Sequence, residues 1–155
     1  MIEDGKKPRG LGLLSQLLGF RFRRIQNHLA RGLVQAPGFD ATRPGELSVL
    51  AIMGANPGLS QVELADEVGL DATMVVVLID DLESRGFARR SRMSEDRRRN
   101  RLFITAEGEA ALQRWMAVAR ENERLVRESL SDAEFAVLSE LLDRIYDRCF
   151  NHAQE

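Results

Sequence analysis

The chain has 155 residues, of which 44% are hydrophobic and 30% charged, a composition that suits one globular domain or two closely joined subdomains. The longest apolar run, residues 74–79, has six residues and is far too short to cross a bilayer, so no membrane partner is expected. A single cysteine, Cys149, excludes an intrachain disulfide and fits a cytoplasmic location.

The positive charge is concentrated in one stretch, although the formal net charge of the chain is −2. Residues 85–101 contain eight arginines and two acids, a balance of +6, whereas residues 106–155 contain eleven acids and six arginines, a balance of −5. A run of arginines is often only a solvated surface. Here arginine replaces lysine throughout the stretch, and its planar guanidinium suits phosphates and base edges. We therefore expect a nucleic acid as the partner, provided that the neighbouring elements form a suitable scaffold.

The first predicted element is one long helix over residues 11–33, preceded by a tail at residues 1–9. Its apolar positions recur in steps of three or four along one face: 11, 14, 18, 22, 25, 29 and 33. The segment 34–45 contains two prolines and two glycines and is expected to be a connection. Its end overlaps a second predicted helix, from about Arg43 to Ala55, which Thr42 caps.

A short helix and a longer one follow in close succession. Ser60 and Glu63 have the spacing of a capping box, which opens the short helix, and Gly69 supplies the left-handed residue that ends it. Asp71 caps the longer helix, which closes at Gly86. The helical wheel of this longer helix places the following residues in the core: Val75, Leu78, Ile79 and Leu82. This arrangement predicts a helix-turn-helix, whose second helix enters the major groove of DNA.

Two strand-like segments, FARRSRM (87–93) and NRLFIT (100–105), come directly after the second helix. The polar segment between them predicts a hairpin with a charged tip. A basic hairpin beside a recognition helix is typical of a wing, which enters the minor groove, where the negative potential attracts arginine. The expected partner of the arginine-rich stretch is therefore double-stranded DNA.

The C-terminal part of the chain predicts two more amphipathic helices. Thr105 caps the first, which is expected to continue to about residue 129, and a second capping box, Ser131 and Glu134, opens the other. The last helix has an apolar stripe made of Phe135, Leu138, Leu141, Leu142 and Ile145. Together with the first helix of the chain, these helices would expose long apolar faces in a single chain, so we expect a homodimer that buries them.

The order and spacing of these elements resemble the MarR family of winged helix-turn-helix transcriptional regulators, from about residue 11 to residue 146. The most specific segments are SQVELADEVGLDATMVVVLIDDLESRGFARR and EDRRRNRLFITAEGEAAL. The resemblance implies a mainly α fold with a small β-hairpin wing. In this fold a winged helix-turn-helix DNA-binding domain (42–108) joins a helical dimerisation lobe (10–40 and 109–150), and a short tail (151–155) follows.

The resemblance also implies a ligand-responsive transcriptional regulator, usually a repressor, that binds a pseudo-palindromic operator as a homodimer. Its effector would be a small aromatic acid or the coenzyme A thioester of such an acid. An enzyme is not expected, because neither histidine has a nucleophile partner and the sequence has no zinc-spaced cluster or glycine-rich phosphate loop. No catalytic residue, metal site or cofactor is therefore assigned. The alternatives are a redox- or partner-controlled regulator and an interaction module with weak DNA specificity.

The residues expected to bind DNA lie on the helix-turn-helix and the wing. They are Ser60, Gln61, Ala72, Thr73, Met74, Val76, Val77, Arg90, Arg97, Arg98 and Arg99. By resemblance, Asp96 braces Arg98 within the wing. Val76 and Val77 depart from the polar residues usual in the family, because valine contacts thymine methyl groups but makes no hydrogen bonds to base edges. Specificity is therefore expected to depend more on the wing and on DNA shape.

Three residues are candidates for ligand binding: Arg24, His28 and Trp115. Each also has an ordinary explanation, because Arg24 and His28 suit a solvated helix face and a lone tryptophan at helical spacing usually belongs to the core. Cys149 is a candidate redox sensor, but its place near the C-terminus favours a bystander role.

Overall fold

The structure, a computed structural model, describes residues 10–41, 43–92 and 100–151. Its elements in chain order are η1 (Gly12–Gln16), α1 (Leu18–Gln35), α2 (Glu46–Ala55), α3 (Gln61–Val68), α4 (Ala72–Ser84), β1 (Ala88–Arg92), β2 (Asn100–Ile104), α5 (Ala106–Asn122), α6 (Arg124–Glu128), α7 (Asp132–Tyr146) and η2 (Asp147–Asn151). Here η1 is a 3-10 helix and η2 is a π-helix. Within the described residues, no helix is long and apolar enough to cross a membrane.

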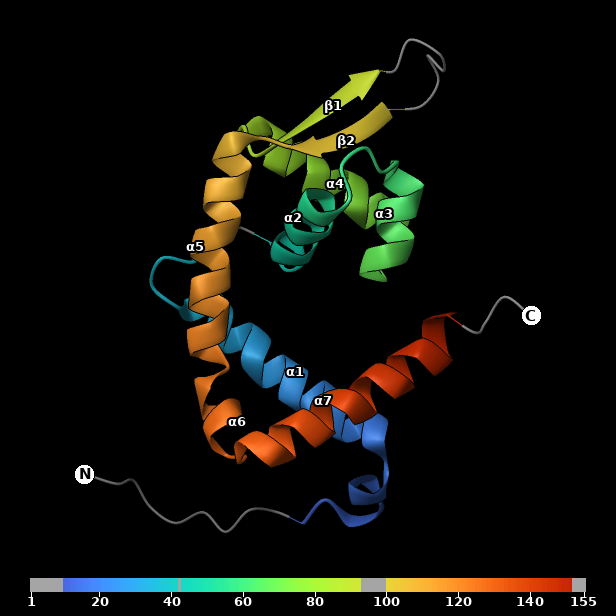
Figure 1. Ribbon diagram of the computed structural model, residues 1–155, viewed down its shortest axis with the longest axis vertical. Helices are drawn as coiled ribbons and strands as arrows, with labels where there is room; N and C mark the ends of the chain where they lie inside the picture. Colours follow the sequence, from blue (N-terminus) through green and yellow to red (C-terminus); the bar gives the residue numbers. More distant parts are fainter. Residues whose placement is uncertain (1–9, 42, 93–99, 152–155) are drawn as a thin grey trace.

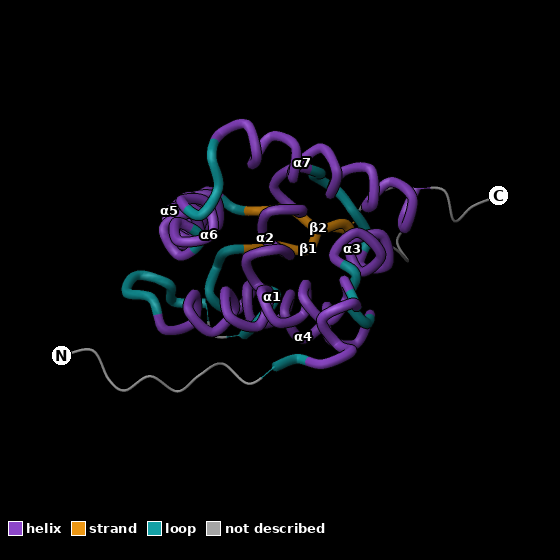
Figure 2. Tube along the Cα trace, turned by 90° about the horizontal axis from the view of Figure 1, so that it is seen from below, coloured by secondary structure: helices purple, strands orange, loops and turns teal. Residues whose placement is uncertain are grey.

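The elements form two lobes that α5 joins (Figure 1). The core lobe contains α2, α3, α4 and the β1–β2 hairpin, and the helical lobe contains η1, α1, α6, α7 and η2. α5 runs along the side of the molecule from the base of the hairpin to the helical lobe, where α1 and α7 lie on opposite sides in the view from below (Figure 2). The hairpin and the helical lobe therefore lie at opposite ends of the molecule.

The buried hydrophobic residues belong to the core lobe and to the adjoining part of α5. They are Val49, Leu50, Met53, Leu64, Ala65, Val75, Leu78, Ile79, Leu82, Ala88, Leu102, Ala111 and Trp115. All four residues of α4 that the helical wheel assigned to the core are fully buried, which confirms that prediction. Trp115 of α5 lies in the same core, with its ring 5.6 Å from that of Phe39 and 5.9 Å from that of Phe87. α5 therefore contributes to the core lobe as well as joining the two lobes.

The helix ends in the core lobe have the structure that the sequence predicts. The Ser60 hydroxyl oxygen accepts the backbone N–H of Glu63 at 3.3 Å, and the Glu63 carboxylate accepts the backbone N–H of Ser60 at 2.7 Å, which confirms the capping box. Gly69 ends α3 with a left-handed φ of 66°. Asp71 caps α4 by accepting the backbone N–H of Thr73 at 2.8 Å. The short turn between α3 and α4 is thus fixed by local hydrogen bonds.

The N-terminal helix is shorter than predicted. α1 begins at Leu18 and residues 12–16 form a separate 3-10 helix, so the prediction of one helix over residues 11–33 was wrong at its N-terminal end. Leu17, between the two helices, has an extended backbone with φ −97° and ψ 114°. Gly12 has a left-handed φ of 54°. Neither conformation continues an α-helix. The regular spacing of apolar residues therefore extends over two segments that do not share one helical axis.

The second helix also begins later than predicted, at Glu46 rather than Arg43. Gly45 has a φ of 97°, which lies outside the right-handed helical region and therefore excludes Gly45 from the helix. Thr42, the expected cap, lies outside the described residues.

The helix that Thr105 caps ends at Asn122 rather than near residue 129, and α6 follows it as a separate short helix. The Asn122 side chain donates to the backbone carbonyl of Leu29 at 2.8 Å, which ties the end of α5 to α1. The caps predicted at Thr105 and Ser131 are both confirmed.

The predicted hairpin is confirmed: β1 and β2 pair antiparallel, with Arg90 opposite Leu102. The outer edge of β2 pairs in turn with the segment before α3. Leu102 accepts the backbone N–H of Gly58 at 2.8 Å and donates its own N–H to the carbonyl of Leu59 at 2.9 Å. The segment before α3 therefore pairs with β2 like a short third strand and joins the hairpin to the helix-turn-helix.

The base of the hairpin is held against α5. The backbone N–H of Thr105 donates to the carbonyl of Phe87 at 3.0 Å. Gly108, in the first turn of α5, lies so close to this carbonyl that a Cβ on it would be only 2.0 Å from the oxygen. Any larger residue at this position would push α5 away from the hairpin.

The helical lobe contrasts with the core lobe because none of the described residues of η1, α1, α6 and α7 is buried. Its exposed large apolar residues near the N-terminus are Leu11, Leu13, Leu14, Leu17, Leu18, Phe22 and Ile25. Those near the C-terminus are Phe135, Val137, Leu138, Leu141, Leu142, Ile145, Tyr146 and Phe150. The apolar stripe expected on the last helix therefore lies on the surface of the single chain.

Candidate nucleic-acid interface

The N-terminal half of α4 presents the surface that the sequence assigned to the major groove. Its exposed residues are Ala72, Thr73, Met74, Val76 and Val77, while Val75 among them is buried. Val76 and Val77 are 36% and 38% exposed, so both valines are available to a partner. Apolar side chains on this face suit contacts with thymine methyl groups and offer no hydrogen bonds to base edges.

Asp71 places a negative charge at the N-terminus of this surface. Two hydrogen bonds lower the pKa of Asp71 below its usual value. The larger contribution comes from the backbone N–H of Thr73 and the smaller from the Thr73 hydroxyl. Asp71 is therefore ionised at neutral pH and stabilises the first turn of α4. Because a carboxylate repels phosphates, arginines of other elements must supply the positive charge for the DNA backbone.

The remaining residues expected at the interface lie on α3 and the wing. Ser60 is engaged as the cap of α3, and Gln61 lies beside Arg90. With its amide oxygen turned toward Arg90, Gln61 accepts from Nε at 3.2 Å and from Nη2 at 3.0 Å. Four other residues, Asp96, Arg97, Arg98 and Arg99, lie outside the described residues, so their roles as wing brace and DNA contacts stay predictions.

Arg90 is held by carboxylates of α4. Its Nη2 donates to Asp80 Oδ1 at 2.6 Å and its Nη1 donates to Glu83 Oε2 at 2.5 Å. The second oxygen of Glu83 accepts the backbone N–H of Arg90 at 2.9 Å. The Arg90 side chain is only 21% exposed. Arg90 therefore connects α3, α4 and β1 within the chain.

Arg85 joins the C-terminal end of α4 to the start of α2. Its Nη1 donates to Glu46 Oε2 at 2.9 Å, and the side chain of Glu46 is completely buried. Its Nη2 donates to the backbone carbonyl of Asp40 at 2.9 Å. The guanidinium also lies over the rings of Phe87 and Trp115, 4.6 Å and 5.5 Å from their centroids. From the sequence alone, Arg85 counted only as part of the arginine-rich stretch, so this network was missed.

Asp40 belongs to the same cluster. The indole N–H of Trp115 donates to Asp40 Oδ1 at 2.5 Å, and this hydrogen bond is the main reason why the pKa of Asp40 lies below its usual value. The positive charge of Arg85 lowers the pKa in the same direction. The connection between α1 and α2 is thus attached to both α5 and α4.

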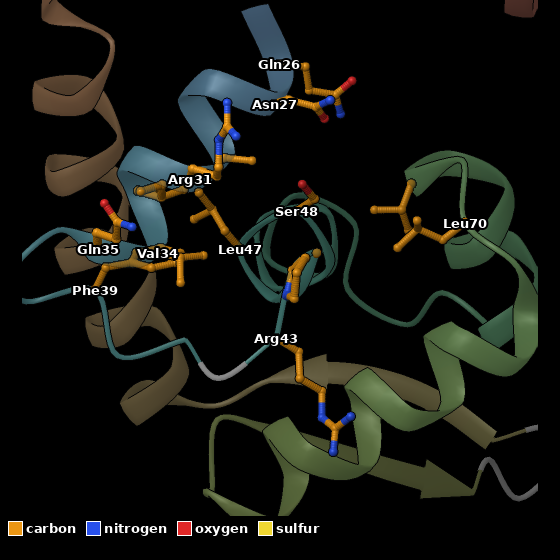
Figure 3. A pocket seen from close by; sticks show the side chains of 15 residues that line it. Gln26, Asn27, Arg31, Val34, Gln35, Phe39, Arg43, Leu47, Ser48 and Leu70 are labelled. Atoms are coloured by element: carbon orange, nitrogen blue, oxygen red, sulfur yellow. The ribbon is translucent and has the colours of Figure 1, made fainter. Parts of the chain in front are cut away.

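A cavity of about 710 Å³ lies between α1, the connection after it, α2 and the end of α3 (Figure 3). Its apolar lining is Ala30, Leu33, Val34, Phe39, Pro44, Gly45, Leu47, Val68 and Leu70, and its polar lining is Gln26, Asn27, Arg31, Gln35, Arg43 and Ser48. Figure 3 shows side chains of α1 on one side of the cavity and Leu70 on the other. No carboxylate is among these lining residues, and Arg31 lies beside the other side chains of the cavity while the Arg43 side chain points away from them (Figure 3), so Arg31 is the cation available to an anionic ligand.

The structure does not bring the three candidate ligand residues to this cavity. Arg24 and His28 are exposed on α1, and Trp115 is buried in the core. The cavity instead contains Arg31, which follows Arg24 by seven residues and so lies on the same side of α1. Arg24 therefore lies two turns before the cavity on this face, and the ligand-binding roles of Arg24, His28 and Trp115 stay predictions.

No residue of the recognition helix lines the cavity, but Gly45, which does, lies against this helix. A Cβ on Gly45 would lie 3.1 Å from Leu78 Cδ1 of α4 and 3.2 Å from Leu70 Cδ1. The next residue, Glu46, holds Arg85 at the end of α4. One short segment therefore lines the cavity and touches α4 at two points.

Among the described residues, no three His, Cys, Asp or Glu side chains are grouped so as to hold a metal ion. The features that the structure does bring together are an exposed recognition helix, an antiparallel wing attached to it and a cavity that adjoins a segment in contact with this helix. They define a winged helix-turn-helix DNA-binding protein.

Comparison with known proteins narrows this class to one family. The family model described as MarR family matches residues 43–99. A Thauera aromatica protein described as a transcriptional regulatory protein for the hcr operon is 34% identical over 139 residues, which are 87% of this chain and 82% of that protein.

Two solved structures are similar over nearly their whole length. The repressor CouR, bound to a 23-mer DNA duplex, is 32% identical with a TM-score of 0.77, over 88% of this chain and 96% of CouR. PcaV from Streptomyces coelicolor, in complex with its natural ligand, is 27% identical with a TM-score of 0.74, over 86% of this chain and 94% of PcaV. The protein therefore belongs to the MarR family and is a DNA-binding transcriptional regulator, not an enzyme.

Proposed function

We propose that this regulator is a homodimeric repressor in the cytoplasm that releases its operator when an anionic aromatic ligand binds. Each protomer places α4 in the major groove and the hairpin in the minor groove of one half of a pseudo-palindromic site. The ligand is an aromatic acid or the coenzyme A thioester of such an acid. The observation that carries the proposal is the cavity lined by Arg31, which adjoins the segment that contacts the recognition helix.

The exposed apolar surface of the helical lobe supports the dimer. Leu138, Leu141 and Ile145 lie at 37%, 45% and 43% exposure on α7, and Leu14 and Phe22 are similarly exposed at the other end of the chain. Monomeric soluble proteins rarely expose continuous apolar surface of this kind. A second copy of the same lobe covers it by two-fold symmetry and holds two recognition helices at a fixed separation.

The lining of the cavity supports the class of ligand. A volume of about 710 Å³ falls in the range of small-molecule sites, and the lining is mostly apolar, which suits an aromatic ring. Arg31 supplies positive charge for a carboxylate or a phosphate. Phe39, at the edge of the cavity, is also in ring contact with the buried Trp115. The two relatives described with an operon and a natural ligand agree with a regulator of this kind.

The contacts of Gly45 and Glu46 support a mechanism for release. A ligand that displaces the segment before α2 moves the residues that touch Leu78 and Arg85, and both belong to the recognition helix. The two α4 helices of the dimer then no longer match two successive turns of the major groove. The ligand weakens DNA binding to the extent that it binds the displaced state more tightly than the DNA-bound state.

The test begins with a DNA duplex from the region upstream of the protein's own gene. The unliganded protein is expected to retard this duplex more strongly than a random duplex in a gel shift. Benzoate-type acids and their coenzyme A thioesters are then titrated, with free coenzyme A as the control for the nucleotide part. Loss of the shift together with a change in the fluorescence of Trp115 supports the ligand. If every compound of both kinds leaves the shift unchanged, the effector is wrong, while the DNA-binding function stands.

The wing is tested by the salt dependence of binding. Each phosphate that an arginine neutralises contributes about −0.9 to the slope of log affinity against log salt concentration. Arg97→Ala, Arg98→Ala and Arg99→Ala are each expected to weaken specific and random DNA by similar factors. Asp96→Ala is expected to weaken binding too, because Arg98 loses its brace, although the change removes a negative charge. Tighter binding by Asp96→Ala would show that Asp96 is only a repelling surface charge.

The alternative of a redox-controlled regulator depends on Cys149, which is exposed beyond α7. Cys149→Ser separates the two hypotheses. If Cys149→Ser still responds to the ligand and keeps its DNA affinity under oxidant, the cavity is favoured as the sensor. If the unaltered protein responds to oxidant and Cys149→Ser does not, the thiol is favoured.

A further inference from the structure

We propose that Arg90 is a positioning residue that fixes the angle between the recognition helix and the wing, and that it does not contact DNA. Its sequence neighbours and its place in the arginine-rich stretch suggest a phosphate contact. The contacts of its guanidinium, however, are all within the protein. The inference rests on DNA binding through α4 and the hairpin.

The guanidinium of Arg90 is occupied by three partners from two helices. Nη1 and Nη2 donate to the carboxylates of Glu83 and Asp80, and Gln61 accepts from Nε and Nη2. A planar guanidinium that makes charge-assisted hydrogen bonds in several directions has few donors left for a phosphate. Moving Arg90 to DNA would leave two carboxylates of α4 without their cation beside a polyanion, which opposes binding.

Glu83 makes the joint more rigid because it holds the backbone of β1 as well as the side chain. Its Oε1 accepts the backbone N–H of Arg90 at 2.9 Å, on the edge of β1 that faces away from β2. The opposite edge of the hairpin is paired to the segment before α3 through Leu102 and Leu59. Both edges of the wing are therefore attached to the helix-turn-helix. Ionised side chains take part on both sides, because Arg101 of β2 also pairs with Glu63 of α3 at 3.3 Å, but only the joint at Arg90 reaches the recognition helix α4.

The arrangement explains two of the three acids on the DNA-binding helix, since the third, Asp81, pairs with Arg85. Asp80 and Glu83 follow the exposed surface of α4 and point toward the hairpin, so their attraction for Arg90 sets the orientation of the wing relative to the helix. An arginine is required because a lysine ammonium is a point charge that cannot span Asp80, Glu83 and Gln61 at once.

The decisive experiment measures the affinity of the full-length protein for the upstream duplex after changes to each partner. Glu83→Gln and Asp80→Asn remove a negative charge beside DNA, so a simple electrostatic effect, or the release of Arg90 toward a phosphate, strengthens binding. The positioning role predicts the opposite sign: weaker binding, by about tenfold for Glu83→Gln and less for Asp80→Asn. Asp66→Asn, which removes an exposed carboxylate of α3, is the matched control for charge.

Arg90→Lys separates the two roles by geometry. The change keeps the positive charge, so a phosphate contact would survive it, whereas the positioning role predicts a loss of about tenfold. In the double variant Arg90→Lys/Glu83→Gln, the losses are expected to be smaller than the product of the single losses, because both changes break the same joint. Thermal unfolding checks that each variant remains folded. Tighter or unchanged binding by Glu83→Gln, or full affinity of Arg90→Lys, would overturn the proposal.

A measurement without DNA keeps the inference independent of the operator. Hydrogen exchange of the Arg90 backbone amide is expected to accelerate in Glu83→Ala and to stay as in the unaltered protein in Asp66→Asn. Unchanged exchange in Glu83→Ala would overturn the joint even if the chosen duplex binds normally. Failure of the unaltered protein to bind any DNA would instead count against the DNA-binding geometry proposed above.

Discussion

The core lobe and the helical lobe reach stability in different ways. The core lobe buries thirteen hydrophobic residues with part of α5, whereas none of the described residues of α1, α6 and α7 is buried. The first lobe has an interior of its own, and the second presents its apolar side chains to the surface. Since burial of apolar surface is the main driving force of folding, the dimer proposed above would supply to the helical lobe the burial that the core lobe already has.

This difference indicates that the two lobes have different roles in DNA binding. A rigid, self-sufficient core fixes the recognition helix and the wing relative to each other. The helical lobe, by the dimer proposed above, sets the distance between two such cores. The cavity lies where the two lobes meet, between α1 and α2, so a bound ligand contacts both lobes at once.

The largest expected effect comes from breaking the helical lobe's partner surface. Leu141→Arg places a charge in the middle of the α7 stripe and is expected to give a monomer that binds the operator on the order of a hundredfold more weakly, because two linked half-site contacts become one. Sedimentation and a gel shift measure the two effects. Glu140→Arg, one residue earlier on the same helix, is the control and should remain dimeric. A monomeric Leu141→Arg with full operator affinity would contradict the dimer.

A change in the interior of the core lobe tests the other half of the comparison. Leu78→Ala removes a fully buried side chain of α4 and is expected to lower the free energy of unfolding by about 2–5 kcal/mol. Leu142→Ala, on the half-exposed stripe of α7, should cost about 1 kcal/mol or less in the isolated chain. Urea unfolding at several protein concentrations measures both losses. Equal losses would mean that the two lobes do not differ as described.

The junction of the lobes is tested by the arginine inside the cavity. Arg31→Ala is expected to raise the concentration of aromatic acid needed for half release of DNA by about tenfold, because a charged hydrogen bond to the ligand is lost. Arg24→Ala removes an arginine from the same face of α1 outside the cavity and serves as the control. A stronger effect for Arg24→Ala than for Arg31→Ala would place the ligand nearer the N-terminus of α1, as the sequence alone suggested.

The smallest expected effect is a change in pH dependence at Asp40, also at the junction. Its pKa is lowered in the folded protein, first by the Trp115 hydrogen bond, so its contribution to stability is present above the unfolded-state value and is lost as the pH falls through the lower, folded-state value. Asp40→Asn should therefore make the free energy of unfolding fall less steeply between about pH 5 and pH 3. Urea unfolding across this range measures the slope, and identical slopes for the two proteins would refute the assignment.

The elements that the sequence predicted well are those fixed by neighbouring residues. The capping boxes, the glycine after α3 and the buried face of α4 depend on contacts within a few positions of the chain, so residue type and spacing identify them. The errors at the ends of α1 and α2 have a different cause. The apolar period continues through Leu17, and the sequence does not show that this residue and Gly45 leave the helical region.

The candidate site was predictable only in part because it depends on contacts between distant segments. Arg85 and Arg90 look alike in the sequence as members of one basic stretch, yet Arg85 pairs with Glu46, which lies 39 positions earlier, and Arg90 pairs with α4. The cavity likewise depends on how the connection after α1 folds back, which no helical period reveals. The acids on α4 could have indicated these pairs, because carboxylates so close to the hairpin are expected to pair with its arginines.

α5 is attached to other elements at both ends, so a tilt of this helix moves one lobe relative to the other. Its N-terminal end is fixed by the close approach of Gly108 to the hairpin, Trp115 near its middle is buried in the core, and its C-terminal end is tied to α1 through Asn122. A helix of 17 residues is about 25 Å long, so a tilt of about 5° at one end moves the other by about 2 Å. A small tilt of α5 at the core lobe is thereby enlarged at the helical lobe into a shift of about 2 Å, which is comparable to the length of a hydrogen bond.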